Sequence, residues 1–341
     1  MITVANNARW EPTGLREVAD TCVANMRTHK KESSYKSMWW EYLFSWEQKI
    51  NSTIENFING SYLFFPMMTF RFTDQIVTAW EYKDRLILNF LRKIISPVVK
   101  HIMTNCYHLN GPTGIKKAID FVRNSMKNVN YRYFIRADIK DYYASIDRNI
   151  LVKQTQKHFM DLRLVKYLEN VITTAIDDGG VVTTPKLGIP RGSSLSPIFG
   201  ALYLEELDQA FQKKTGISYC RFMDDIVILA KTKRQFLKAK KCMQLILLSL
   251  KLKLSRTKTQ MGEFTKGFHL LGIDFAVSQN QQDNEKIQVT TSLHPRTYRR
   301  ALNKIYAMEE GAVNSVKVLR YLFRWATWWS MVIGSKNNCD V

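Results

Sequence analysis

The pattern of apolar and polar positions predicts two strands that meet at an acidic pair. Mainly apolar residues occupy positions 219–223 and 226–230, and Asp224 and Asp225 lie between the two runs. A strand that enters, turns at this pair and leaves as a second strand places both carboxylates at the tip of a hairpin. Two neighbouring carboxylates are costly to bury unless positive charge meets them, so such a tip suits divalent metal ions. The alternative is an ordinary surface turn, in which Asp-Asp pairs are common.

A second acidic strand lies upstream. Residues 133–143 read as an apolar strand that ends on Asp138, followed by two tyrosines and the start of a helix. Phosphoryl transfer with two metal ions needs carboxylates from separate elements to converge, with the ions roughly 3.5–4 Å apart. Asp138 therefore provides a third carboxylate for the pair at Asp224 and Asp225, on the assumption that the two strands are neighbours.

A turn rich in Gly, Pro and Ser occupies residues 187–197, between the two acidic strands. Ser193 or Ser194 could cap a helix that begins near Ser196 and runs towards Ala210. A Gly-rich turn at the start of a helix can approach a nucleotide or a template strand closely and present backbone N–H groups to it. An ordinary capped loop is the alternative.

The N-terminal part of the pattern is mainly helical. Residues 14–60 are predicted to form helices, and their large aromatic and apolar side chains cluster on one face: Trp39, Trp40, Tyr42, Leu43 and Trp46. We interpret this face as a core or docking surface rather than as a platform for base stacking. The following segment mixes element types: short strands around 62–72, a helix from Asp84 to about Met103, a turn at 110–114 and a helix over 115–126.

Downstream of the acidic hairpin, residues 234–250 have the spacing of an amphipathic helix that covers the back of a sheet. Residues 276–290 are predicted to be a polar loop and the best candidate for a linker. Residues 291–341 are predicted to form two helices that carry both arginines and tryptophans: Arg299, Arg300 and Lys304 on the first, and Arg320, Arg324, Trp325, Trp328 and Trp329 on the second. Such helices can hold a nucleic-acid backbone and stack on bases, or form an aromatic core with a basic rim. We interpret the tryptophans as core and the arginines as contacts to a duplex.

The charge balance points to a polyanionic partner. The chain of 341 residues has 50 Lys and Arg against 30 Asp and Glu, a formal net charge of +20. The basic residues recur along the whole chain, whereas a membrane surface would favour one basic amphipathic helix or a terminal tract. This distribution favours a nucleic-acid groove whose binding weakens steeply with salt.

Cysteine usage and hydropathy predict a cytoplasmic protein without membrane association. The five cysteines are widely spaced and odd in number, which indicates free thiols and no structural zinc: Cys22, Cys106, Cys220, Cys242 and Cys339. Cys106 and His108 lie close in sequence, but without a second pair of ligands we interpret them as packing residues. No run approaches about 18 apolar residues, and the first ten residues lack the pattern of a signal peptide, so neither a transmembrane helix nor a leader is expected.

Taken together and in this order, the acidic strands and the turn between them resemble the palm of reverse transcriptases. Asp138 with Tyr143 is similar to the first palm motif, residues 188–197 to the second and residues 222–225 to the third. Three further segments match motifs of the family: 252–259 the fourth palm motif, with Lys258 as its basic residue, 268–273 the primer grip, and 82–85 a fingers motif ahead of the palm. The resemblance covers about residues 60–280, and the five motifs from the first palm motif to the primer grip, in the right order, make it very specific.

The resemblance implies an α+β, right-hand polymerase fold. We expect an N-terminal helical extension over 1–60, fingers over 61–132, a palm over 133–275 with an antiparallel sheet backed by helices, and a linker with a short helical thumb over 276–341. Phe222 stands where the third motif usually begins with Tyr. Arg191 stands where many viral enzymes have Gln, and a basic residue there is common in group II intron-like enzymes. All three aspartates are intact, so nothing in the sequence indicates an inactive enzyme.

The resemblance also assigns roles to individual residues. Asp138, Asp224 and Asp225 are the expected catalytic metal ligands, with the backbone carbonyl of Ile139 as a further ligand. Tyr143 stands where the family packs a ring under the sugar and excludes a 2′-hydroxyl; by its pattern alone it is a core aromatic at a strand end. The expected nucleotide-binding residues are Arg71, Lys83, Arg85, Tyr143, Arg191, Gly192 and Lys258. The expected nucleic-acid contacts are Ser193, Ser194, Phe222, Met223, Leu271, Gly272, Arg299, Arg300 and Arg324.

The implied activity is RNA-directed DNA polymerisation from dNTPs, with two Mg²⁺ ions per site and Mn²⁺ as an alternative. The chain shows no Cys/His endonuclease segment, no RNase H-like acidic constellation and no long DNA-binding tail, so we expect a compact, free-standing bacterial enzyme. It resembles the group II intron-like and defence-associated (unknown group) kinds, which implies an antiphage role with a dedicated non-coding RNA. The expected partners are an RNA template and a DNA product, with a partner protein or a second copy of the chain as additions. The alternatives are a polymerase and splicing cofactor of a mobile intron, and a non-catalytic RNA-binding scaffold.

Overall fold

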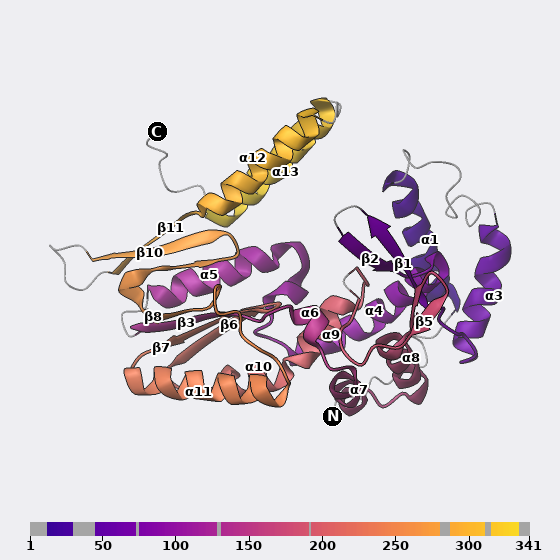
Figure 1. The fold of residues 1–341 in the computed structure, drawn as a ribbon, viewed down its shortest axis with the longest axis horizontal. Coiled ribbons are helices and arrows are strands. Elements are labelled where there is room, and N and C mark those ends of the chain that lie inside the picture. Colours follow the sequence, from indigo (N-terminus) through magenta and orange to yellow (C-terminus); the bar gives the residue numbers. More distant parts are fainter. Residues whose placement is uncertain are drawn as a thin grey trace. The chain divides into compact units, whose positions relative to one another are not determined.

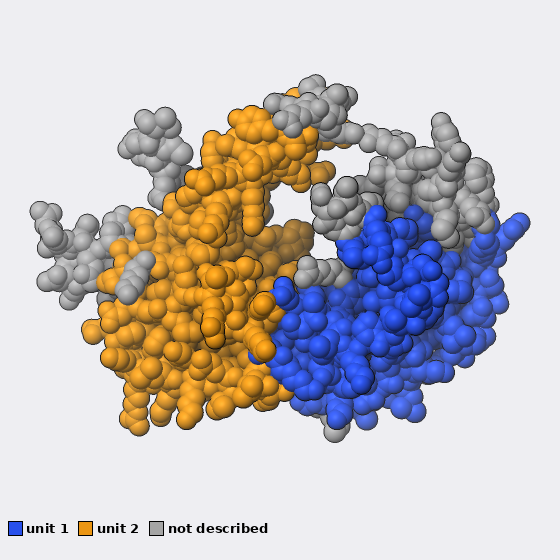
Figure 2. Space-filling view, viewed as in Figure 1, with its two compact units in different colours: residues 1–104, 141–205, 250–252 blue, residues 105–140, 206–249, 253–341 orange. Residues whose placement is uncertain are grey.

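The computed structural model describes residues 12–29, 45–72, 75–127, 131–190, 192–279, 287–310 and 315–333. The chain forms two compact units, coloured separately in Figure 2. The first unit consists of residues 1–104, 141–205 and 250–252, and the second of 105–140, 206–249 and 253–341. Each unit is therefore assembled from stretches that are far apart in sequence.

The first unit combines helices with a small mixed sheet. Its sheet has the strand order β2-β1-β4-β5, in which β1 pairs antiparallel with β2 and parallel with β4. Its elements are α1 (Pro12–His29), α3 (Trp46–Ile58), β1 (Met67–Phe72), β2 (Gln75–Ala79), α4 (Tyr82–Ile102), α6 (Tyr142–Ser145), α7 (Arg148–His158), α8 (Leu162–Thr173), β4 (Ile176–Asp178), β5 (Val181–Thr183) and α9 (Ser196–Tyr203).

Helix α4 is the long helix that the sequence predicts from Asp84 to about Met103, and this prediction is confirmed. Its buried face is almost wholly apolar, from Leu86 to Val99. Asp84 is the exception, because it is fully buried and accepts a hydrogen bond of 2.5 Å from the Tyr62 hydroxyl. Burial raises the pKa of this carboxyl to about 6.

The second unit contains two antiparallel sheets, with the strand orders β6-β7-β3-β8 and β11-β10-β9. Figure 1 shows helices α5 and α11 on opposite faces of the first of these sheets. The elements are η2 (Tyr107–Thr113), α5 (Gly114–Met126), β3 (Tyr133–Asp138), α10 (Glu205–Gln212), β6 (Ile217–Phe222), β7 (Asp225–Ala230), α11 (Lys233–Ser249), β8 (Gln260–Glu263), η3 (Phe264–Lys266), β9 (Phe268–Leu270), β10 (Ile273–Gln279), β11 (Ile287–Leu293), α12 (Pro295–Glu310) and α13 (Ser315–Ile333).

The core of the second unit lies around α5. Ala118, Ile119 and Val122 on this helix are fully buried among apolar residues of both sheets, including Phe134 of β3 and Phe275 of β10. Side chains alternate between the two faces of a strand, so β3 and β7, which lie in the middle of their sheet, are buried on both faces over most of their length. This burial fixes the register of the strands that carry the acidic residues.

Two details of the predicted organisation are wrong. Residues 276–290, expected to be a polar loop, include the end of β10 and the start of β11, which pair antiparallel from Ile273↔Leu293 to Gln279↔Ile287. Apolar residues alternate with polar ones in both strands, and Phe275 is buried in the core of the second unit, so the polar loop is predicted too long at both ends. The helix expected from Ser196 towards Ala210 is broken at Leu204 into α9 and α10.

The two C-terminal helices are present as predicted. Helices α12 and α13 contact each other, and α13 also contacts α5 (Figure 1). Trp328 packs against the core of the second unit, and the rings of Trp325 and Trp329 stack with centroids 6.1 Å apart. Trp39, Trp40, Tyr42, Leu43 and the side chain of Trp46 lie outside the described residues. Among the residues that the structure describes, no helix has both the length and the apolar character needed to cross a bilayer.

Candidate active site

Strand pairing brings the three predicted aspartates to one end of the central sheet. β3 and β7 pair antiparallel, and in their register Asp138 lies opposite Asp225. Directly opposed residues in such a pair have Cβ atoms about 4.5–5.5 Å apart. β6 and β7 pair with Phe222 opposite Asp225, so Asp224 lies in the two-residue turn between them. The hairpin and its adjacency to the strand of Asp138 are therefore confirmed.

Each of the two opposed carboxylates faces a basic side chain of its own unit. The Nη2 atom of Arg136 is 2.6 Å from Oδ1 of Asp225, and both side chains are largely buried. The Nζ atom of Lys258 lies 3.3 Å from Oδ1 of Asp138, which is buried, whereas the lysine is exposed. Backbone hydrogen bonds from Ser255 N to Asp138 O and from Lys140 N to Lys253 O hold the segment of Lys258 beside the end of β3.

Burial makes the acidic cluster electrostatically costly. It raises the pKa of Asp225 to about 6, an effect that Arg136 opposes and that the carboxylates of Asp224 and Asp138 increase. Burial also raises the pKa of Asp224, again with a contribution from Asp138. The ionised cluster therefore needs more positive charge than the neighbouring side chains supply.

A divalent metal ion fits this need. Oδ1 of Asp138 is buried and accepts no hydrogen bond from any described residue, although it faces Lys258. Carboxylate oxygens from separate strands are the ligands that Mg²⁺ and Mn²⁺ prefer. Asp138, Asp224 and Asp225 are thus the residues that would hold such ions. Ile139, whose carbonyl is a further predicted ligand, is buried directly after the strand.

The turn that carries Asp224 is clamped by buried side chains. Met223 has a left-handed backbone with φ 55°, a conformation that is unfavourable for a residue with a side chain. Its N–H donates to Nδ1 of His108 at 3.1 Å, and its carbonyl accepts from Nη1 of Arg221 at 3.0 Å. Arg221 is fully buried and pairs with Asp208 of α10 through two nitrogens. The clamp therefore holds both polar backbone groups of the residue that precedes the acidic pair.

The clamp residues were missed by the sequence analysis. His108 was interpreted as packing with Cys106, and its Nδ1 is indeed 3.2 Å from the Cys106 sulfur. Arg221 and Arg136 stand inside runs that otherwise read as apolar strands. A charged residue at a position predicted to be buried on both faces implies a buried acidic partner. This signal was available for both arginines, although the identity of their partners was not.

In the first unit, the segment of Tyr143 is tied to the Gly-rich turn. Ile189 N donates to Tyr143 O at 2.9 Å, and Gly188 N donates to Ile146 O at 2.8 Å. Gly188 has φ +86°, and a side chain on it would also crowd the backbone of Ala144. The half-buried ring of Tyr143 leans against Tyr142, with ring centroids 5.6 Å apart. The Tyr143 part of the first predicted motif therefore meets the second motif within this unit, whereas Asp138 lies in the second unit.

The serines and Gly192 of the Gly-rich turn do not cap α9 in the way that the sequence predicts. The N-cap position of α9 is Leu195 rather than a serine, and Ser193 Oγ accepts from Leu195 N at 3.3 Å. Ser194 Oγ is buried without a hydrogen-bond partner among the described residues. Gly192 is exposed, and Arg191 lies outside the described residues.

The three predicted triphosphate-binding cations of the first unit are already engaged. Arg71 forms an exposed ion pair with Asp178. The Nζ atom of Lys83 lies 3.8 Å from the centre of the Phe65 ring and 3.8 Å from Oε2 of Glu81. Arg85 Nε donates to Trp80 O at 3.1 Å. A triphosphate would have to compete with these contacts.

The predicted primer-grip residues form the turn between β9 and β10. Leu271 and Gly272 both have positive φ, 50° and 84°, as a tight hairpin turn requires. The carbonyl of Gly272 accepts from His294 N at 3.0 Å and from Thr297 Oγ1 at 3.2 Å. This turn is therefore fastened to the start of α12. Three predicted nucleic-acid contacts are exposed on the C-terminal helices: Arg299 and Arg300 on α12 and Arg324 on α13.

A second group of metal-type ligands lies beside this turn. One ligand atom each of His269, Asp274 and His294 lie within 4.8 Å of one another. However, Nδ1 of His294 accepts a hydrogen bond from Arg296 N at 3.1 Å, so the neutral ring carries its proton on Nε2. Because neither nitrogen of His294 then offers an unused lone pair, we interpret His294 as a hydrogen-bond acceptor at the start of α12.

Comparison with known proteins identifies the family of the chain. The family profile described as "Reverse transcriptase (RNA-dependent DNA polymerase)" matches residues 75–275, more than half of the chain. "Protein YkfC" of Escherichia coli (strain K12) is 22% identical over 228 residues, which cover 56% of this chain and 60% of YkfC. "Putative COX1/OXI3 intron 1 protein" of Saccharomyces cerevisiae (strain ATCC 204508 / S288c) is 24% identical over 128 residues, which cover 37% of this chain and 15% of that protein. The chain thus spans less than two thirds of either relative.

Among solved structures, a chain of the "Partial Cas6-RT-Cas1--Cas2 complex" aligns with a TM-score of 0.42 and 18% sequence identity. The alignment covers 71% of this chain and 42% of that chain.

Removal of the buried partner of Arg221 is expected to destabilise the protein strongly. Asp208→Ala leaves a fully buried guanidinium without its carboxylate, which costs about 3–5 kcal/mol in the free energy of unfolding. Urea denaturation followed by circular dichroism measures this loss. The matched control, Asp178→Ala, breaks the exposed pair with Arg71 and should change stability by less than about 1 kcal/mol. Equal losses of unfolding free energy in the two variants would contradict the importance of the buried Arg221–Asp208 pair.

Mild acid is expected to weaken the binding of divalent cations. The pKa of Asp225 is raised to about 6, so this carboxyl is ionised above that pH and takes up a proton as the pH falls through it. The protonated carboxyl is a poor ligand, and bound cation competes with the proton. Titration calorimetry with Mn²⁺ should therefore show affinity falling below about pH 6, with occupancy restored by more Mn²⁺. An affinity that stays constant between about pH 5 and pH 8 would argue against this ligand.

Proposed function

The chain belongs to the reverse transcriptase family, and from this membership we propose that it is an RNA-directed DNA polymerase that adds deoxynucleotides from dNTPs to a primer. The observation that carries the proposal is the register of β3 and β7, which opposes Asp138 and Asp225 beside the turn of Asp224. The raised pKa values of Asp224 and Asp225 support a catalytic role over that of a scaffold, because perturbed pKa values cluster at functional sites.

In this proposal, the three aspartates hold two Mg²⁺ ions, with Mn²⁺ as an alternative. When bound, such ions lower the pKa of the primer 3′-hydroxyl and stabilise the leaving pyrophosphate. The roles of the protein's own groups follow from their placement. The clamp of Met223 by Arg221 and His108 fixes the direction of Asp224, and Arg136 orients Asp225.

Lys258 is proposed to act on the triphosphate. Its exposed ammonium lies 3.3 Å from Asp138 and is free to move towards an incoming phosphate, because a lysine side chain is flexible. There it would neutralise the charge that develops on the pyrophosphate. Arg71, Lys83, Arg85, Arg191 and Gly192 are proposed as further contacts of the nucleotide.

Tyr143 is proposed to select the sugar of the nucleotide. Its backbone accepts a hydrogen bond from Ile189, and its ring leans against the ring of Tyr142. Gly200 leaves room for both rings, since a Cβ atom there would lie 3.2 Å from each. A ring fixed in this way can exclude a 2′-hydroxyl by its bulk.

The proposed contacts of the template and primer lie at turns and on exposed helices. Exposed cations such as Arg299, Arg300 and Arg324 suit phosphate groups, and the net charge of +20 favours a polyanion. Six other residues, at turns or next to them, are proposed to contact the template or primer: Ser193, Ser194, Phe222, Met223, Leu271 and Gly272. We propose fingers over 61–132, a palm over 133–275 and a thumb towards the C-terminus as the functional division of the chain.

The biological role is proposed to be antiphage defence in the bacterial cytoplasm, together with a dedicated non-coding RNA. This role rests on the resemblance of the motif wording to group II intron-like and defence-associated enzymes. The alternative role is that of a mobile-intron polymerase and splicing cofactor, which the name of the yeast relative favours. Sequencing the RNA that co-purifies with the protein distinguishes the two, since a flanking ribozyme would identify an intron.

Substitution of Asp138 is expected to abolish DNA synthesis. Asp138→Asn removes a metal-binding charge, so primer extension on an RNA template should fall at least about a hundredfold, while RNA affinity stays within about twofold. The matched control is Asp141→Asn, at an exposed residue three positions later whose left-handed backbone Asn also tolerates. Synthesis near the wild-type rate in Asp138→Asn would overturn the proposed metal site.

Substitution of Tyr143 is expected to relax sugar selection. Tyr143→Ala removes the ring, so kcat/KM for rNTPs relative to dNTPs should rise roughly tenfold or more. Tyr143→Phe keeps the ring and should keep the wild-type ratio, which separates bulk from the hydroxyl. An unchanged ratio in a Tyr143→Ala protein that still polymerises would remove the assignment.

A further inference from the structure

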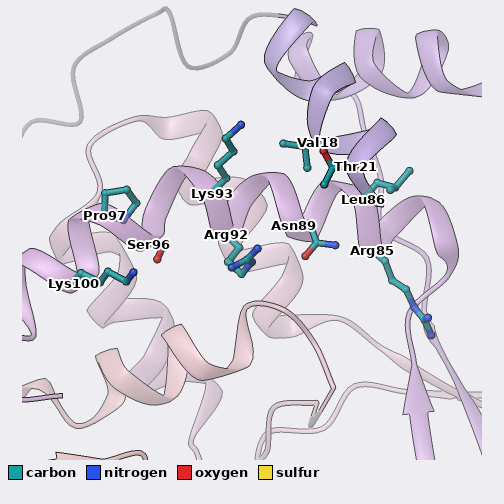
Figure 3. A pocket seen from close by; sticks show the side chains of 10 residues that line it. All are labelled: Val18, Thr21, Arg85, Leu86, Asn89, Arg92, Lys93, Ser96, Pro97 and Lys100. Atoms are coloured by element: carbon teal, nitrogen blue, oxygen red, sulfur yellow. The ribbon is translucent and has the colours of Figure 1, made fainter. Parts of the chain in front are cut away.

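A groove runs between α1 and α4 in the first unit, well apart in sequence from the acidic strands. Figure 3 shows the side chains that line it. Its volume is about 810 Å³, and it is open to solvent. The α4 residues that line it include Arg85, Asn89, Arg92, Ser96 and Lys100.

These α4 residues form a polar stripe along one face of the helix. Each of the five residues is three or four positions from the next. This spacing keeps them on the same side of the helix, because an α-helix has 3.6 residues per turn. The opposite side of α4 is buried and apolar. The stripe therefore extends for about 22 Å at 1.5 Å per residue, from Arg85 to Lys100.

The groove carries positive charge without a compensating acid in its lining. Its lining residues include four cations, Arg85, Arg92, Lys93 and Lys100, and no carboxylate. Lys93 is 3.4 Å from Glu17. Arg92 and Lys100 are exposed and form no ion pair with any residue in the described ranges. Arg92 and Lys100 therefore carry positive charge with no acidic partner among the described residues, and such charge on one face is a signature of a polyanion site.

The spacing of the cations selects a polymer over a small anion. Arg92 and Lys100 are eight residues apart, about 12 Å along the helix axis, so they do not converge on a single phosphate. The uncharged Ser96 between them offers a hydroxyl to a sugar or phosphate oxygen. Half-buried Val18 adds apolar surface against which a base or sugar can pack.

We infer that this groove binds the sugar-phosphate backbone of a single strand of nucleic acid, through Arg92, Lys93 and Lys100. The inference deepens the proposed function, since a polymerase must hold a strand, and it adds a strand-binding surface in the unit that does not contain the three aspartates. The same backbone chemistry is offered by an RNA and by a DNA strand.

The test measures binding rather than synthesis. Full-length wild type and the double variant Arg92→Ala/Lys100→Ala are titrated with fluorescent single-stranded RNA and, separately, single-stranded DNA of the same sequence, without dNTPs or divalent metal. Because binding to single strands depends on salt with a slope of about −0.7 per phosphate contact, loss of two contacts should lower the slope of log K against log salt by about 1.4. A stronger effect with one of the two strands identifies the natural ligand.

The matched control removes the same charges elsewhere. Arg234→Ala/Lys238→Ala takes one exposed Arg and one exposed Lys from α11, so it changes the net charge equally and should leave the slope close to the wild-type value. Thermal unfolding verifies that all variants are folded. Equal slopes in wild type and Arg92→Ala/Lys100→Ala would overturn the inference, as would equal losses in the two double variants.

Ultraviolet crosslinking of the bound strand gives a second readout that needs no variant. Crosslinked peptides from α1 or α4 are expected, and their absence while other peptides crosslink would contradict binding in the groove.

Primer extension is assayed separately, so the proposed function and the proposed strand-binding groove can fail independently. A protein that binds a strand through α4 but makes no DNA would overturn the proposed function alone, and a protein that makes DNA with an unchanged salt slope would overturn the groove alone. The same proteins are also titrated with phosphatidylserine vesicles. Binding of the protein to these vesicles and to neither nucleic acid would overturn the inference and indicate a membrane-binding surface.

Discussion

The central constraint on the second unit is the burial of negative charge at the end of its sheet. Asp138 and Asp225 are opposed by the register of β3 and β7, and that register is fixed because both strands are buried on both faces. Arg136 and Lys258 lie against these carboxylates, and Arg221 with Asp208 forms a second buried pair under the neighbouring turn. The apolar core around α5 thus fixes the strands, and the strands fix the charges.

In the first unit, the position of Tyr143 depends on the close approach of the Gly-rich turn. Tyr143 lies in the short helix α6, shortly after the end of β3. Ile189 of the Gly-rich turn donates a hydrogen bond to its backbone carbonyl. Glycines at 188 and 200 make this close approach feasible, one through its left-handed φ and the other through the space that it leaves for two rings. The position of the Tyr143 ring therefore depends on small residues in a segment more than forty positions downstream.

Much of this arrangement could be predicted from the sequence. The apolar strands ending on Asp138 and Asp224, the long helix α4 and the paired C-terminal helices follow from hydrophobic periodicity and turn chemistry. The hairpin of β10 and β11 could also have been predicted, because apolar residues alternate with polar ones in both strands: Ile273, Phe275 and Val277 in β10, and Ile287, Val289 and Leu293 in β11. The partners of Arg136 and Arg221 could not be found, since a sequence reveals that a buried charge needs a partner but not which distant residue the fold brings to it.

The pair of Arg136 with Asp225 and the approach of Lys258 to Asp138 have a consequence for which cations the site can accept. These basic side chains act as resident counterions, each supplying one positive charge. A potassium or sodium ion that replaced one of them would bring no more charge than the residue it displaced, and would lose its hydration shell as well. A doubly charged ion gains in that exchange. An ion at the proposed site would have to compete with these counterions, and on charge alone this competition favours a divalent over a monovalent ion.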